Sequence, residues 1–287
     1  EAWKAVRERL TNVAFLRYQG VNLSKAAARA LYGLTLENSV SRLETYAACA
    51  YRHFLQYGLS LEEREEFGFE SVDMGNVFHA VLESFAMMLK DSDYTWFDFP
   101  KEFGEKKVLE ALEAYAAEYG ATILYSNARN EYAITRMARV LTRTVLTLQS
   151  QLQKGEFQPD AVEKSFYYTD DLDSVNVALS EEEKMRLKGR IDRIDTAEDE
   201  EHVYVKVIDY KSGSRQFDLA ALYYGLQLQL VVYMNAAMEL EARKHPDKEV
   251  VPAALLYYHI EDPTVETPVE LSEEELNEEI LSKLRMK

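Results

Sequence analysis

GRIDRID at residues 189–195 and VIDYKSG at residues 207–213 are the two stretches that decide how this chain folds. Both are rich in β-branched residues, which is typical of strands in a sheet. A polar turn at 197–201 separates them, so we expect the two strands to pair as a hairpin. The pairing would bring Asp192 and Asp209 close together at one end of the hairpin.

Further carboxylates and an amine extend this pattern. Lys211 lies two residues after Asp209, so side-chain alternation turns both to the same face of the strand. Asp195 lies three residues after Asp192 and is expected on the opposite face, where it would cap the turn. Two neighbouring carboxylates suit Mg²⁺ or Mn²⁺. The alternative is a surface Asp-x-Lys ion pair, but Asp192 sits in an apolar strand, where an unpaired carboxylate is costly.

The regions around the hairpin predict an α/β fold. Strands are expected at 161–168, 186–196 and 203–210, and a fourth, largely buried strand at 252–260 follows a helix over 219–242. The first 155 residues have mostly helical spacing, with helices expected at 42–57, 72–90, 103–119 and 126–154. Ser41 and Glu44 would form a capping box at the start of the first of these.

Two expected helices carry polar residues that could reach the sheet. His79 and Glu83 are one turn apart on the helix at 72–90, so they share a face. Gln229 and Tyr233 are one turn apart on the later helix and could hold Lys211 in place or hydrogen-bond a nucleic-acid backbone. Each could equally be an ordinary structural residue, but imidazole and two carboxylates together form a sound divalent-metal set.

The composition limits the function classes. The formal net charge of −17 over 287 residues excludes a protein that coats nucleic acid through a general positive field, because phosphate binding draws on Lys and Arg. Cys49 is the only cysteine, so an internal disulfide is impossible. There is no apolar run of about 18 residues and no signal-peptide pattern, so we expect a cytoplasmic location and no membrane.

In chain order, the motifs resemble those of RecB-family PD-(D/E)XK nucleases. The matching elements are His79, the Gly-x-Ile-Asp that ends in Asp192, Asp209-Tyr210-Lys211, and Gln229-x-x-x-Tyr233. The sequence at 39–49, 57–61 and 257–263 is similar to that of the AddB group, the deoxyribonuclease subunits of bacterial helicase-nucleases. The resemblance spans about 39–263, which is most of the chain.

The resemblance implies a restriction-endonuclease-like core, in which helices flank a mixed central sheet, with an N-terminal helical region. Residues 156–262 would form the nuclease core, 1–155 the helical region that contributes His79, and 263–287 an acidic, truncated C-terminal segment. His79, Asp192, Asp209 and the Tyr210 carbonyl would bind Mg²⁺ or Mn²⁺. Lys211, Asp192 and Asp209 would be catalytic. The supporting residues would be Gln229, Tyr233 and Glu83.

The activity implied by the resemblance is hydrolysis of phosphodiester bonds in single-stranded DNA, behind a helicase, in double-strand break repair and recombination. The implied partner of the full-length protein is AddA, the other helicase-nuclease subunit. In AddB the position of Cys49 supplies one ligand of an iron-sulfur cluster, but the other three cysteines are absent from this chain, so we expect no cluster here. The alternative is a module of the same complex that binds DNA or a partner without cutting.

Overall fold

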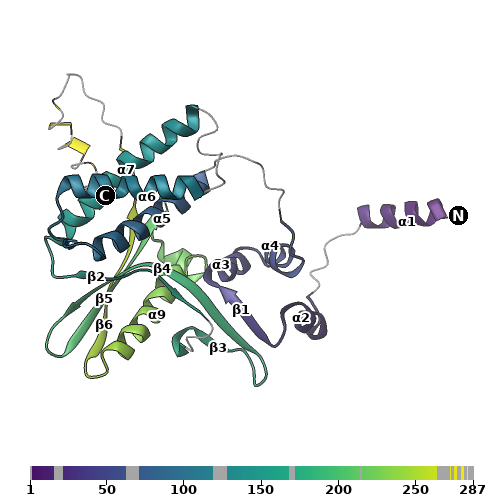
Figure 1. Ribbon diagram of the computed structural model, residues 1–287. Helices are drawn as coiled ribbons and strands as arrows, with labels where there is room; N and C mark the ends of the chain where they lie inside the picture. The colour runs from purple at the N-terminus through teal and green to yellow at the C-terminus, as the bar shows by residue number, and fades with distance from the viewer. Residues whose placement is uncertain are drawn as a thin grey trace.

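The computed structural model describes residues 2–15, 22–62, 71–118, 128–167, 172–213, 215–263 and a few positions beyond 271. Six strands form a mixed sheet at its centre (Figure 1). Their bounds are β1 Thr35–Ser39, β2 Gln158–Phe166, β3 Asn176–Ala178, β4 Lys184–Glu198, β5 His202–Lys211 and β6 Glu249–His259. The expected α/β fold with a mixed sheet is therefore confirmed.

The 15-residue strand β4 organises the sheet. Its first part pairs in parallel with β1 and antiparallel with β3, and its second part pairs antiparallel with β2 and β5. Arg193 lies opposite Ile208 at the end of the β4–β5 pairing, so Asp192 and Asp209 are the residues next to this pair on the two strands. The hairpin expected from the sequence is confirmed.

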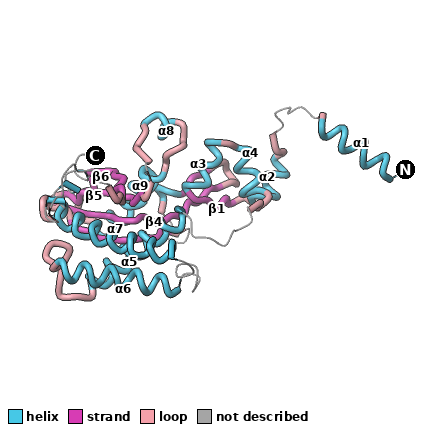
Figure 2. Tube along the Cα trace, turned by 90° about the horizontal axis from the view of Figure 1, so that it is seen from above, coloured by secondary structure: helices cyan, strands magenta, loops and turns pink. Residues whose placement is uncertain are grey.

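Helices cover both faces of this sheet (Figures 1 and 2). On one face, α5, α6 and α7 pack in a core cluster with Ile208 and Tyr210 of β5. On the other face, α9 packs with Val205 and Val207, so β5 alternates between two cores. The helix bounds are α1 Ala2–Ala14, α2 Lys25–Tyr32, α3 Val40–Ala48, α4 Ala50–His53, α5 Ser71–Lys90, α6 Lys101–Glu118, α7 Ala128–Leu152, α8 Leu219–Tyr223 and α9 Gln229–Lys244.

Two expected helices are interrupted. The helix expected at 42–57 is divided into α3, α4 and a π-helical turn, Phe54–Gly58, because the backbone is extended at Cys49. Its N-cap is Ser39, whose hydroxyl accepts a hydrogen bond from the Arg42 amide, so the prediction of Ser41 was wrong. The helix expected at 219–242 is split into α8 and α9 around Gly225, which has a φ of 75°.

The predicted strand content also needs correction. The 35–39 segment, in the region expected to be helical, forms β1, and the acidic loop before β4 contains β3. The strand expected at 252–260 exists as β6, but it is the last strand in the sheet order and none of its residues is fully buried. An edge position also explains how this strand accommodates Pro252, which has no amide hydrogen to donate to a neighbour.

None of the helices in the described ranges combines the length and the apolar character needed to cross a bilayer. Most of the acidic segment at 263–287 lies outside the described residues.

Candidate metal centre

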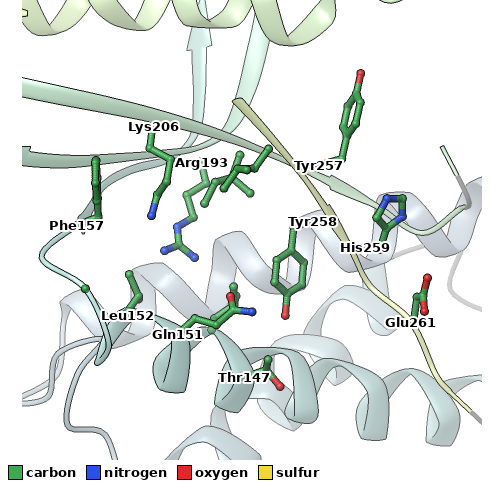
Figure 3. Close-up of a pocket in the computed structure, with 14 residues that line it drawn as sticks. Thr147, Gln151, Leu152, Phe157, Arg193, Lys206, Tyr257, Tyr258, His259 and Glu261 are labelled. Carbon is green, nitrogen blue, oxygen red and sulfur yellow. The ribbon is translucent and has the colours of Figure 1, made fainter. Parts of the chain in front are cut away.

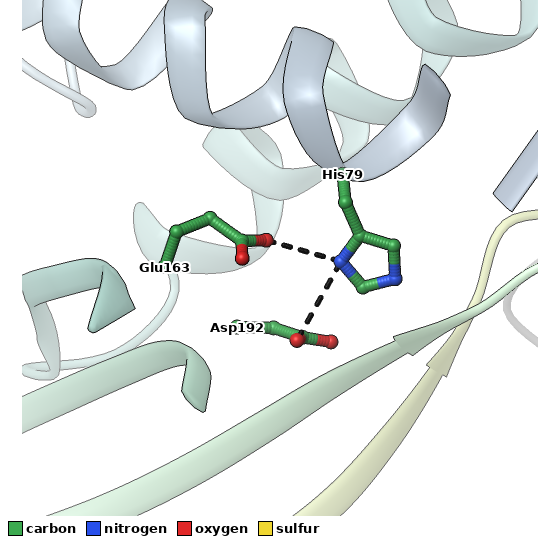
Figure 4. A group of neighbouring side chains, drawn as sticks. All are labelled: His79, Glu163 and Asp192. Carbon is green, nitrogen blue, oxygen red and sulfur yellow. Dashed lines mark hydrogen bonds and ion pairs between the residues drawn. The ribbon is translucent and has the colours of Figure 1, made fainter. Parts of the chain in front are cut away.

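Three ligand-type side chains meet between α5, β2 and β4 (Figure 4). His79 Nδ1 lies 3.0 Å from Glu163 Oε1 and 3.5 Å from Asp192 Oδ1. One donor atom from each residue lies within 4.8 Å of the other two, an arrangement found at no other place among the described residues. The expected approach of His79 to the sheet is therefore confirmed, whereas Glu163 was not predicted.

Asp209 and Lys211 lie beside this group. The second oxygen of Asp192, Oδ2, accepts a hydrogen bond of 2.7 Å from the Tyr210 amide, which ties Asp192 to β5. Asp209 forms an ion pair with the Lys211 ammonium, as expected for two residues on one face. Both Asp209 oxygens are buried, and neither accepts a hydrogen bond of normal geometry from the described residues. A buried carboxylate in this condition is costly unless a cation lies close to it.

The start of α9 holds Lys211. Gln229 Oε1 accepts a hydrogen bond of 3.1 Å from Lys211 Nζ, and Gln229 Nε2 donates one of 3.3 Å to the Tyr233 hydroxyl. Of the two functions expected for this pair, holding Lys211 is the one that the contacts confirm. Glu44 fixes the start of the helix, because its carboxylate accepts hydrogen bonds from the Leu228 and Gln229 amides. Glu44 therefore caps α9 from a distance, and does not form the capping box predicted for its own helix.

Gly189, the glycine of the Gly-x-Ile-Asp motif, allows close packing behind the site. A Cβ atom at this position would lie 2.6 Å from the Phe166 ring and 2.9 Å from the Tyr233 ring. Those distances are shorter than carbon contacts allow, so only glycine fits here without a shift of the aromatic rings. The motif therefore keeps Tyr233, and through it Gln229, against the sheet.

Glu163 has an unusual backbone conformation for its position in β2. Its φ is 50°, in the left-handed region that residues with a side chain rarely adopt. Its side chain is nearly fully buried, and its second oxygen, Oε2, lies 2.7 Å from Nε of Arg190. Strained backbone is often retained at functional sites. The sequence signal for Glu163 was weak, because an acidic residue in a half-buried strand is common. Only the approach of α5 and β4 in the folded chain distinguishes Glu163 from other acidic residues in strands.

The charges in this group perturb one another. Burial, together with the nearby Asp209 carboxylate, raises the pKa of Asp192 to about 8. Burial lowers the pKa of His79, but the hydrogen bond with Glu163 and the charge of Asp192 outweigh it, so the net pKa is raised. Glu83, one turn further along α5, has its pKa raised by burial and by the charge of Glu163. The neighbouring carboxylates therefore disfavour ionisation of one another.

The residues present fit a divalent cation of the Mg²⁺ or Mn²⁺ type. They offer oxygen ligands from Glu163, Asp192 and Asp209 and one imidazole, His79, and Asp209 Oδ1 has no hydrogen-bond donor among the described residues. A bound cation would offset the repulsion between the carboxylates.

Asp195, which was expected to cap a turn, lies in a different cluster. Its two oxygens accept hydrogen bonds of 2.5 and 2.9 Å from the Arg193 guanidinium, and Lys206 Nζ lies 2.8 Å away. Asp195 is fully buried, so the prediction was wrong. Arg193 and Lys206 line a cavity of about 520 Å³ above α7, into which Arg193 and Tyr258 extend while Tyr257 points away (Figure 3).

Cys49 lies at the junction of α3 and α4, where its exposed sulfur accepts a hydrogen bond of 3.5 Å from the Arg52 amide. No contact between Cys49 and the group around His79 is found among the described residues. No cluster of cysteines can form in this chain, which contains only one.

Comparisons with known proteins give a consistent result. Residues 37–287 match the model of the PD-(D/E)XK nuclease superfamily. The chain is 47% identical over 260 residues to the B-type subunit of an ATP-dependent helicase/deoxyribonuclease of Lachnoclostridium phytofermentans, covering 89% of this chain and 21% of that protein. It is 37% identical over 286 residues to the protein of that name in Alkaliphilus metalliredigens, covering 99% of this chain and 25% of the relative. The chain thus spans a quarter or less of the length of these relatives.

Proposed function

The chain belongs to the PD-(D/E)XK nuclease superfamily, and we propose that it is a Mg²⁺-dependent deoxyribonuclease domain that hydrolyses phosphodiester bonds of single-stranded DNA. The observation that carries this proposal is the meeting of His79, Glu163 and Asp192 beside the Asp209–Lys211 pair. Such a set combines cation ligands with an amine next to them, which is what metal-assisted phosphodiester hydrolysis requires.

In this proposal His79, Asp192, Asp209 and the Tyr210 carbonyl hold the cation, and Glu163 is a fifth ligand or binds through water. The cation, when bound, polarises the scissile phosphate and favours ionisation of the attacking water. The Lys211 ammonium orients that water and offsets negative charge on the phosphorane-like transition state.

The surrounding residues keep this amine in place. Gln229 accepts a hydrogen bond from Lys211, and Tyr233 fixes Gln229 in turn. Because the Lys211 amine must stay charged and close to the reacting phosphate, these two residues are positioning residues for it. Glu83, on the same face of α5 as His79, would hold a water or tune the charge of Glu163.

We further propose that residues 156–262 form the nuclease core, that 1–155 supply His79 to it, and that the chain works in a longer helicase-nuclease. The relatives are named as subunits of an ATP-dependent helicase/deoxyribonuclease, which supports action behind a helicase. Following the family resemblance of the motifs, the partner subunit would be AddA and the process DNA repair and recombination. The chain has no Gly-x-x-x-x-Gly-Lys-Ser/Thr loop, so ATP hydrolysis would belong to other parts of such an assembly.

The test compares cleavage with binding. Fluorescently labelled single-stranded DNA is incubated with the purified chain and Mg²⁺, Mn²⁺ or EDTA, and with Asp209→Ala. Cleavage that requires the cation and disappears in Asp209→Ala is expected. Binding of the labelled strand in Ca²⁺ without cleavage in Mg²⁺ or Mn²⁺ would instead favour a non-cleaving DNA-binding module, and full activity in Asp209→Ala would refute the proposed site.

A further inference from the structure

Three arginines of α7 converge on one carboxylate just after β6. Arg136 Nε and Arg139 Nη2 lie 3.0 and 2.6 Å from Asp262 Oδ2, and Arg143 Nη1 lies 3.4 Å from Oδ1. The spacing of three and four residues puts the three guanidinium groups on one face of α7. Burial would raise the pKa of Asp262, but the hydrogen bonds from Arg136 and Arg139 outweigh it and lower the pKa, so Asp262 stays ionised.

This arginine cluster has more positive charge than its acids neutralise. Three guanidinium groups face Asp262, and Glu261 lines the same cavity as Arg136, so among the described residues one positive charge remains after both acids are counted. The Arg136 and Arg139 side chains are 48% and 53% exposed, so both can reach a ligand from solvent.

The cluster shares a cavity with residues that adjoin the candidate metal centre in the sequence. Arg136 lines a cavity of about 320 Å³ together with Phe78 of α5 and with Ser212, which follows β5. Phe78 immediately precedes His79, and Ser212 immediately follows Lys211. A chain of phosphates bound at the metal centre would therefore have a neighbouring cavity, with Arg136 at its wall, along which to continue.

We propose that Arg136, Arg139 and Arg143 form a phosphate-binding subsite for the DNA strand next to the metal centre, and that Asp262 is an internal anion that a backbone phosphate displaces. The inference rests on the proposed nuclease function. Arginine suits this role because its planar guanidinium binds phosphate through two parallel hydrogen bonds. Such contacts recognise the backbone and carry no base specificity.

The first experiment measures how salt weakens DNA binding. A fluorescein-labelled oligothymidylate is titrated by fluorescence anisotropy with Ca²⁺ in place of Mg²⁺ over a series of KCl concentrations. Arg139→Gln should weaken binding about fivefold near 0.1 M salt and make the slope of log affinity against log salt shallower by about 0.7, the loss of one phosphate contact with a single strand. Arg139→Lys, which keeps the charge, should retain the slope.

The matched control is Arg243→Gln, because Arg243 is also a half-exposed helical arginine in an ion pair, with Glu239 on α9. It should leave the salt slope as in the unmodified chain. An equal slope for Arg139→Gln and Arg243→Gln would overturn the inference.

Asp262→Asn provides a test of opposite sign. If Asp262 competes with phosphate, its neutralisation should tighten binding of the oligothymidylate about fivefold, the effect expected for one additional phosphate contact. If Asp262 serves only to pin the segment after β6 to α7, the variant should lower the midpoint of thermal unfolding and leave DNA binding unchanged or weaker, which would also overturn the inference.

The outcomes separate this inference from the proposed function. Mg²⁺-dependent cleavage with no change of salt slope in Arg139→Gln would leave the nuclease proposal standing and remove the subsite. An unmodified chain that neither binds nor cuts the oligothymidylate would overturn both proposals.

Discussion

Two charged clusters are built around two aspartates of β4, Asp195 and Asp192. They differ in how their charges are balanced. Asp195 is fully buried, but Arg193 and Lys206 satisfy both of its oxygens. The group around Asp192 collects three carboxylates, and Asp209 is equally buried: the Lys211 ammonium pairs with its Oδ2, but its Oδ1 has no hydrogen-bond donor among the described residues. The first cluster is complete within the protein, whereas the second leaves Asp209 Oδ1 without a partner and could accommodate a cation. A buried charge therefore does not by itself identify a functional site. A buried charge that lacks a partner within the protein is the more informative sign of one.

The largest effect that would test this contrast is expected for Asp209→Asn. The substitution removes a cation ligand and the ion-pair partner of Lys211, so Mg²⁺-dependent cleavage of single-stranded DNA should fall by about ten-thousandfold. The rate is measured under single-turnover conditions. Glu105→Gln, in an exposed ion pair of α6, is the control and should keep the rate of the unmodified chain. A loss of less than tenfold in Asp209→Asn would contradict this assignment.

Substitution of Asp195, in the cluster whose charges are balanced, should change the stability of the protein. Asp195→Ala leaves the buried Arg193 guanidinium without its partner, so the free energy of unfolding should fall by about 3–5 kcal/mol, measured by urea denaturation in EDTA. Asp192→Asn should leave the metal-free protein as stable or make it more stable, because it removes a carboxylate whose ionised form is disfavoured in the folded state. If both variants are equally destabilised, the two clusters do not differ as described.

A smaller effect is expected where Lys211 is held. Gln229→Ala removes the acceptor for the Lys211 ammonium, so kcat should fall about tenfold with little change in KM, as is typical when a supporting hydrogen bond is lost. Gln227→Ala is the control, because Gln227 binds only the backbone of its own loop. Gln229→Glu, which restores an acceptor, should recover part of the rate. A purely structural role would instead lower the midpoint of thermal unfolding.

The smallest effect is a dependence of stability on pH. Asp192 has a pKa raised to about 8, so the folded state binds more protons than the unfolded state between about pH 4 and 8, and stability falls as pH rises through that range. The raised pKa of His79 has the same sign, because its contribution is lost as pH rises above that pKa. A divalent cation bound at this site would take the place of the protons that Asp192 and His79 lose as the pH rises. The increase in the midpoint of thermal unfolding caused by Mg²⁺ should therefore grow from pH 5 to pH 8 by a few degrees.

This pH effect is measured by thermal unfolding with Mg²⁺ and with EDTA across the range. In Asp192→Asn the growth of the Mg²⁺ effect with pH should be reduced. A Mg²⁺ effect that is constant with pH in the unmodified chain would contradict the proposed linkage between proton and cation binding.

The sequence by itself determined the β4–β5 hairpin and the positions of Asp192, Asp209 and Lys211 on it, because alternation and register along paired strands are local properties. It also placed His79 and Gln229 on helices, but whether those helices reach the hairpin stayed open until the structure showed the contacts with Asp192 and Lys211. The motif series was specific enough to indicate the family, which the match over 37–287 confirms.

Only the tertiary structure decided which other residues join these positions. Glu163 is 84 residues from His79, and its place in the group depends on β2 pairing with β4 while α5 packs against β2 and brings His79 to Asp192. Asp195 differs from Asp192 only in having Arg193 and Lys206 as neighbours. A carboxylate in a strand has the same local pattern in either case, and its function depends on the charges that distant segments bring to it.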